Sequence, residues 1–163
     1  MKKYLNILAL LLVSNFSVAG EMPAQVKELY KVLPTKIEAK KLADDLVLTL
    51  KERNYDESYR LFNPRSSTLS KENFIKGNKG AEERFGPWKQ YIYVNPMVQT
   101  VRNPQTGEES YIPAYMYEID LKNYRTKLLL IVMMDIQSEK PRIVAYNYMP
   151  KNTIEHKDTH EME

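Results

Sequence analysis

A change of hydrophobic period near residue 87 constrains the fold of this chain more than any other feature. Before Gly86-Pro87, apolar residues recur every three or four positions, which is the spacing of one face of an α-helix. After it, apolar and polar residues alternate, as in half-buried strands. Helices followed by a run of strands predict an α+β fold, in which N-terminal helices pack on one face of an antiparallel sheet.

One long amphipathic helix is expected to be the main partner of that sheet. Leu42, Leu46 and Leu50 form an apolar stripe at four-residue spacing, which predicts a helix from about residue 35 to residue 53. Thr35 and Glu38 have the spacing of a capping box, so Thr35 is expected to be the N-cap.

The other helices are shorter or weaker. A first helix is predicted at 24–32 and another at 56–62. Ser70 is a good N-cap for a further helix that ends near residue 84. Gly77 and Gly80 each cost that helix about 1 kcal/mol relative to alanine, so it has the weakest intrinsic propensity.

Four strands are predicted after the change of period. Short turns separate them, which favours a curved antiparallel meander. The expected strands span 88–102, 110–121, 126–136 and 142–149. Tyr117 and Ile119 are expected on the core face, and Glu118 and Asp120 on the opposite face, because successive strand residues alternate.

The N-terminus has the pattern of a secretory leader. Two lysines precede an apolar run from Leu5 to Val13, and small residues follow, with cleavage expected after Ala19 and Gly20 as the alternative. A retained membrane anchor is less favoured, because the apolar run is short. We therefore expect an exported protein, periplasmic or secreted. The predicted organisation is a signal peptide at 1–19, a lead-in at 20–34, an α+β domain at 35–150 and a polar tail at 151–163.

Composition excludes several classes of function. The chain has no cysteine, so disulfide scaffolds, thiolate metal sites and cysteine nucleophiles are excluded. The leader contains two lysines and no acidic residue. Without it the chain has 22 basic and 21 acidic residues, and a net charge this close to zero argues against nucleic-acid binding. No glycine-rich phosphate motif occurs, and no cofactor is predicted. The two histidines, His156 and His160, have metal-ligand spacing but fall in the polar tail, where no packed shell is expected to orient them.

Residues 35–150 resemble the nuclear-transport-factor-2-like, or cystatin-like, roll. The resemblance rests on the three N-terminal helices, the terminal meander, and the segments Tyr55–Phe62 and Leu69–Phe74. More narrowly, the chain resembles the small exported bacterial proteins of that superfamily that are classed as a domain of unknown function. The resemblance implies the fold, and it implies that dimerisation through the sheet is common. The superfamily includes isomerases, dehydratases, non-enzymatic binders and secretion-system scaffolds, so the resemblance does not select one function.

The third predicted strand is apolar on both of its faces, which indicates a possible binding surface on the sheet. Residues 128–134 are all apolar, whereas a strand covered on one side should alternate. An outer sheet face is therefore predicted as a surface for self-association or for a protein partner. Its expected members are Leu129, Ile131, Met133, Val144, Tyr146 and Tyr148. Cover by residues 21–34, or by curvature of the sheet, is the alternative.

A pocket between helices and sheet is the second candidate site, with Tyr115, Tyr117 and Leu46 as its expected lining. It is expected to be filled by side chains or to hold a small apolar ligand. In the similar isomerases a carboxylate and a tyrosine face such a pocket, but Asp44 and Asp45 are expected on the helix surface. The sequence therefore favours a non-enzymatic interaction module. A proton-transferring enzyme or ligand binder, and a component of an envelope or secretion assembly, are the alternatives.

Overall fold

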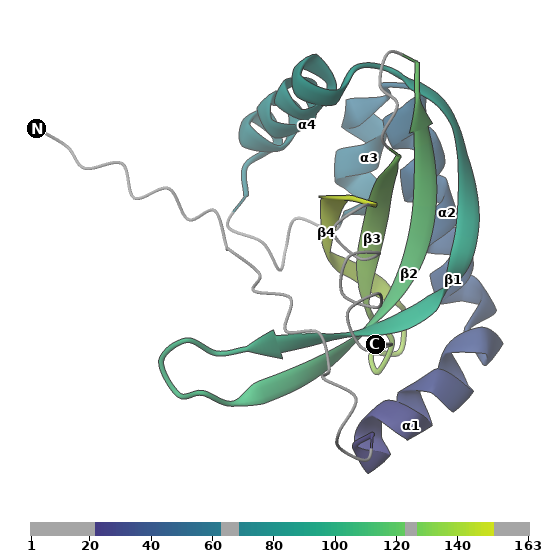
Figure 1. Cartoon of the computed structure of the whole chain (residues 1–163), viewed down its shortest axis with the longest axis vertical. Coiled ribbons are helices and arrows are strands. Elements are labelled where there is room, and N and C mark those ends of the chain that lie inside the picture. The colour runs from purple at the N-terminus through teal and green to yellow at the C-terminus, as the bar shows by residue number, and fades with distance from the viewer. Residues whose placement is uncertain (1–21, 63–68, 123–126, 152–163) are drawn as a thin grey trace, which may run out of the picture.

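The computed structural model describes residues 22–62, 69–122 and 127–151, in which helices precede a four-stranded antiparallel sheet (Figure 1). This confirms the predicted α+β class. The leader, the segment 123–126 before the third strand, and the tail with His156 and His160 lie outside the described residues. The helical elements are α1 (Ala24–Val32), the 3-10 helix η1 (Leu33–Thr35), α2 (Ile37–Lys51), α3 (Tyr55–Leu61) and α4 (Lys71–Phe85). The strands are β1 (Trp88–Arg102), β2 (Glu109–Leu121), β3 (Leu128–Asp135) and β4 (Arg142–Pro150).

The start of α2 differs from the prediction. Thr35 is not the N-cap, because it belongs to η1, and Lys36 occupies the cap position without a side-chain cap. The Thr35 hydroxyl instead donates to the Val32 carbonyl at 2.7 Å. Pro34 lies in the first turn of η1, where its fixed φ suits a helix and no N–H is needed. The capping-box spacing was therefore present in the sequence but is not used.

The caps of the next two helices follow ordinary rules. The Asn54 side chain accepts a hydrogen bond from the Glu57 N–H at 3.3 Å, and Ser70 accepts one from the Asn73 N–H at 3.2 Å. The cap predicted at Ser70 is confirmed. α4 ends at Phe85 and is followed by its C-cap, Gly86, whose φ of 81° lies in the region that favours glycine. Helix and strand are thereby separated within two residues.

The strands follow one another in space, in the order β1-β2-β3-β4, with every pair antiparallel. β1 and β2 are longer than the other two, and their connected ends extend beyond the rest of the sheet (Figure 1). β1 has register shifts at Trp88/Gln90 and at Tyr93/Asn95. These irregularities bend the strand, as β-bulges do. β1 and β4 are the two edges of the sheet.

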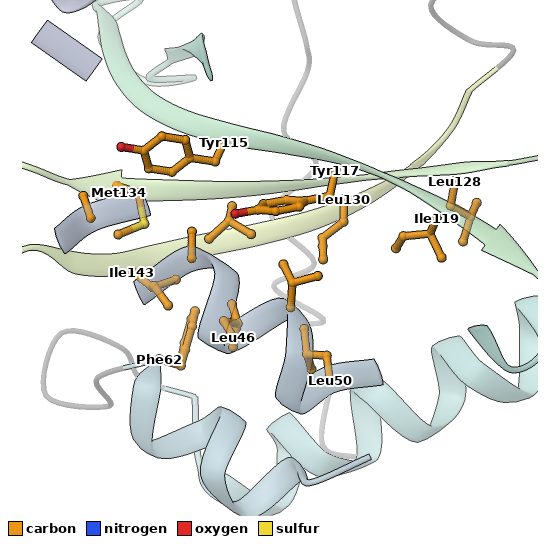
Figure 2. Close-up of a cluster of buried hydrophobic side chains, with 14 of the residues drawn as sticks. Leu46, Leu50, Phe62, Tyr115, Tyr117, Ile119, Leu128, Leu130, Met134 and Ile143 are labelled. Atoms are coloured by element: carbon orange, nitrogen blue, oxygen red, sulfur yellow. The ribbon is translucent and has the colours of Figure 1, made fainter. Parts of the chain in front are cut away.

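The core lies between the helices and the inner face of the sheet. Figure 2 shows Leu46 and Leu50 of α2, with Phe62 after α3, facing side chains from β2, β3 and β4. Leu33 of η1 belongs to the same core, and its carbonyl accepts a hydrogen bond from the Tyr115 hydroxyl at 3.3 Å. Leu29, Val32 and Leu33 of the lead-in are therefore packed into the domain, on the inner side of the sheet. Burial of such side chains contributes about 1.5–3 kcal/mol each.

The facing of β4 corrects the prediction for two tyrosines. Tyr146 pairs with Val132 and Tyr148 with Leu130, both of which belong to the inner core. Directly opposite residues share a face, so Tyr146 and Tyr148 point toward the helices, not outward. A register shift at Met133/Met134 precedes this pairing, and Val144 is the extra residue on β4. One inserted residue reverses the facing of every side chain that follows.

Candidate functional site

The predicted pocket residues are core residues. Leu46, Tyr115 and Tyr117 are each at most 1% exposed, and Figure 2 shows them among the packed side chains between α2 and the sheet. They fill the space in which a pocket was expected. Burial raises the pKa of Tyr115 to about 12. A neutral phenol in such surroundings serves as a hydrogen-bond donor, and its hydroxyl reaches the Leu33 and Lys36 carbonyls.

Asp44 is the carboxylate that comes closest to a catalytic arrangement. Its Oδ1 accepts a hydrogen bond from the Tyr117 hydroxyl at 2.8 Å, and its Oδ2 lies 2.7 Å from Lys40 Nζ. Burial, followed by this hydrogen bond, raises the pKa of Tyr117 far above its usual range. The expectation that Asp44 lies on the helix surface was thus incomplete, because its side chain also reaches the sheet. Asp45 does remain on the surface, paired with Lys41.

The geometry around Asp44 favours a structural role. Lys40 balances the carboxylate charge and also lies 4.0 Å above the ring centre of Tyr93. Both oxygens of Asp44 have partners from the chain, and the side chain is 43% exposed at the surface, so it is not enclosed in a pocket. The cluster therefore holds α2 against β1 and β2.

A small cavity, partly open to solvent, lies at the other end of the helix–sheet interface. Its volume is about 20 Å³, which is the space of about one water molecule. Tyr55, Glu82 and Trp88 contribute to its lining, together with apolar residues of α2 and β3. Tyr55 donates to Glu82 Oε2 at 3.1 Å, and Arg53 is ion-paired with the same carboxylate. Burial and then the Glu82 hydrogen bond raise the pKa of Tyr55 to about 12. The cavity is too small for an organic substrate.

Asn78 and Tyr146 form the polar contact between α4 and the sheet. The Asn78 amide nitrogen lies 2.7 Å from the Tyr146 hydroxyl, and the hydroxyl lies 2.9 Å from the amide oxygen. The Tyr146 ring also meets the rings of Phe62 and Phe74, with centres 5.8 and 5.9 Å apart. Burial raises the pKa of Tyr146. Tyr146, expected on a binding surface, thus anchors a helix.

The outer face is also less accessible than predicted. Leu129, Ile131 and Met133 do lie on it, but their exposed fractions are only 4%, 2% and 2%. Ala114, Ile131 and Met133 form a second apolar cluster, against which partly buried side chains of β1, β2 and β4 pack. Those side chains are Met97, Ile112, Met116, Ala145 and Met149. Val144, the bulge residue, is more exposed. The middle of the outer face is therefore already buried within the chain.

Charged residues border this outer cluster at one end. Glu118 forms ion pairs with Lys127 and Lys151, and Asp120 lies 3.3 Å from Lys127 Nζ. Glu118 and Asp120 face away from the core, as predicted. The Lys127 hydrogen bond, followed by that of Lys151, lowers the pKa of Glu118. The network links β2 to the residues that flank β3 and β4, so it stabilises the sheet.

The most exposed apolar stretch of the sheet lies on edge strand β1. Ile92, Tyr93 and Val94 are consecutive, with exposed fractions of 54%, 41% and 43%. None of them was selected from the sequence. The sequence contains a pattern that could have predicted this exposed edge. The first strand of a meander lies at the edge of its sheet, and the first strand here contains the apolar run Tyr-Ile-Tyr-Val. An edge strand presents unpaired N–H and C=O groups beside such side chains, which suits the addition of another strand.

Two further observations concern the described residues alone. Across 22–62, 69–122 and 127–151, no group of three histidine, cysteine, aspartate or glutamate side chains is placed to hold a metal ion. Within the same ranges, every helix is too short or too polar to cross a membrane. The candidate metal pair of the tail lies outside these ranges.

Comparison of the chain with protein-family models, with curated proteins and with solved structures finds no match. The candidate site therefore rests on the geometry described above: an exposed, apolar edge at β1, beside a core and an outer face that are both filled by the chain itself.

Proposed function

We propose that this chain is an exported, non-enzymatic interaction module that binds protein through the β1 edge of its sheet. The observation that carries the proposal is the run of three exposed apolar residues, Ile92 to Val94, on an edge strand. Export is inferred from the leader pattern at 1–19. The order of helices and meander supports kinship with the nuclear-transport-factor-2-like roll, a superfamily that includes binders.

An exposed apolar stretch on a sheet edge has a free-energy reason to acquire a partner, because edge strands are normally short, charged or covered. In β1 this stretch is confined to Ile92–Val94, between a lysine at position 89 and a proline at position 96. Added strands gain main-chain hydrogen bonds, while alternate side chains give specificity. Ile92 faces outward beside Glu118, and Tyr93 faces the helices beside Tyr117. A bound strand therefore meets an apolar contact on each side of the sheet.

Site-specific photo-crosslinking in the native host tests the proposal. A photoreactive phenylalanine analogue replaces Ile92 in one version and Leu48 in another. Leu48 is the matched control, because it is 41% exposed but lies on α2. We expect a discrete crosslinked product from position 92 and none from position 48. Equal yields at the two positions, or no product at position 92 when the protein is at its native abundance, would contradict the proposal.

A further inference from the structure

We propose that the outer face of the sheet carries a binding site for a soft monovalent metal ion, Cu(I), made by the thioether sulfurs of Met97, Met116 and Met133. The site goes beyond the proposed function, because it lies in the middle of the outer face and does not use the exposed stretch of the β1 edge. Thioethers are soft, neutral ligands, and soft sulfur ligands select Cu(I) over the hard cations that carboxylates bind. The chain has no cysteine, so methionine is its only source of such ligands.

Three strands bring these methionines around one small residue, Ala114. Met97 of β1 and Met133 of β3 are the direct cross-strand partners of Ala114, one on each side of it. Met116 follows Ala114 by two positions on β2 and therefore lies on the same face. The pairing is regular at this point, because the register shifts of β1 lie before Met97 and none interrupts the β2–β3 pairs. The three backbone positions are thus fixed relative to one another.

The spacing suits three side chains that converge. Met97 and Met133 are two strand spacings apart, about 10 Å. Met116 is the diagonal neighbour of both, and long side chains bridge the diagonal separation of about 7–8 Å. Methionine is unbranched and has three rotatable bonds. All three sulfurs can therefore reach the space above Ala114.

The burial of Ala114 indicates that neighbouring side chains already lean over it. Its side chain is a single methyl group on the outer face, yet the residue is 0% exposed. Ala114 and Met133 belong to the outer cluster, and Met97, Met116 and Ile112 are among the side chains that pack against that cluster. These are the four nearest neighbours of Ala114 on its face, and three of them carry sulfur. The thioethers are therefore gathered around one point of the sheet.

The sulfur atoms remain available to an ion. Gln99 Nε2 donates a weak hydrogen bond to Met97 Sδ at 3.8 Å. A thioether sulfur has two lone pairs, so this contact leaves one for a metal ion, and the buried Gln99 amide helps to orient the ligand, as outer partners of metal ligands do. Met97 and Met116 are only partly buried, so an ion can enter from solvent.

The pH dependence of binding separates this site from the histidines of the tail. A histidine must be neutral before it binds a metal ion, whereas a thioether has no proton to lose. Ag(I) is the probe, because it is soft and monovalent like Cu(I) but stable in air. We expect its affinity, measured by calorimetry in chloride-free buffer, to change by less than about twofold between pH 7 and pH 5. A steep loss of affinity at pH 5 would place the ion on His156 and His160 and overturn the proposal.

Nuclear magnetic resonance of the protein labelled with ¹³C at its methionine methyl groups reads each thioether separately. With one equivalent of Ag(I), we expect the signals of Met97, Met116 and Met133 to shift together. Met134 is an internal control that faces the core. Met149 is a second control on the outer face, about 14 Å along the strands from Met133. Equal shifts in the triad and the controls, or no shift in the triad, would overturn the proposal.

Leucine substitutions distinguish metal binding from packing, because they remove the thioether and nearly keep the apolar volume. Met116→Leu is expected to weaken Ag(I) binding at least about tenfold, equal to about 1.4 kcal/mol, with the unfolding temperature of the ion-free protein unchanged. Met149→Leu is the matched control, since that side chain is also partly buried on the outer face, and it should bind Ag(I) like the wild type. A Met116→Leu variant that binds Ag(I) as tightly as the wild type would mean that these methionines serve packing alone.

Discussion

The inner face of β3 packs against another layer of the fold, whereas its outer face packs against neighbours in the same sheet. Leu128 and Leu130 lie in the core beside side chains of the helices and aromatic rings (Figure 2), and Val132 belongs to the same core cluster. Ile131 and Met133, on the other side, meet side chains of β1, β2 and β4, among which methionine predominates. Both sets are buried to nearly the same extent.

Side chains that are equally buried can therefore differ in how tightly their surroundings pack. The inner face is shaped by rigid elements and by packed rings, among which Tyr146 makes edge contacts with Phe62 and Phe74. Methionine is flexible and fills irregular gaps, so the outer face is better able to rearrange around a change. The two faces should therefore respond differently to the same substitution.

The largest loss of stability is expected from Leu130→Ala on the inner face. Removal of a buried leucine costs about 2–5 kcal/mol, and the cost is greatest where the surroundings cannot collapse into the cavity. Leu129→Ala is the matched control on the outer face, one residue away and also buried. We expect its loss of stability to lie at the low end of that range. Urea unfolding of both variants makes the comparison, and an equal or larger loss for Leu129→Ala would remove the proposed difference.

A smaller effect is expected from Tyr146→Phe. The substitution keeps the ring contacts with Phe62 and Phe74 but removes the hydroxyl that bonds with Asn78. A buried amide that loses a partner costs about 1–3 kcal/mol. Tyr111→Phe is the control, because the Tyr111 hydroxyl bonds with the exposed Glu109, and its effect should stay within about 0.5 kcal/mol. Thermal unfolding measures both, and similar losses would mean that the Asn78 contact does not anchor α4.

The smallest effect concerns pH and the charged border of the outer face. The pKa of Glu118 is lowered by Lys127 and Lys151, so ionised Glu118 binds its proton less readily in the folded chain than in the unfolded one. The contribution of Glu118 to the free energy of unfolding is thus fully present above the ordinary pKa of glutamate, and it is lost as the pH falls through the lowered pKa. Glu118→Gln should reduce stability near neutral pH and flatten the decline of stability in acid.

Unfolding measured at a series of pH values between 7 and 3 checks this prediction. Glu109→Gln is the control, because that side chain lies on the exposed start of β2. A pH profile that is unchanged by Glu118→Gln would show that the network does not couple to folding.

Much of the fold could be predicted from local patterns. The helix at Ala24–Val32, the cap at Ser70 and the four antiparallel strands follow from spacing and turn residues. The candidate site was less predictable. The apolar residues on the outer side of β3 are visible in the sequence, but their burial by neighbouring side chains is not. Nor was Ile92 selected, whose exposure depends on the edge position of β1.

The order of the elements follows from the sequence alone, because the periods of helices and strands are properties of consecutive residues. The facing of β4 depends instead on contacts between distant parts of the chain. Strict alternation from Ile143, a core residue, would point Ala145 inward, yet the extra residue Val144 turns Tyr146 and Tyr148 to the helices instead. The physical reason is that a bulge depends on how two strands and the layer behind them fit together. The Phe62 and Phe74 rings and the Asn78 amide, all distant in sequence, stabilise that choice.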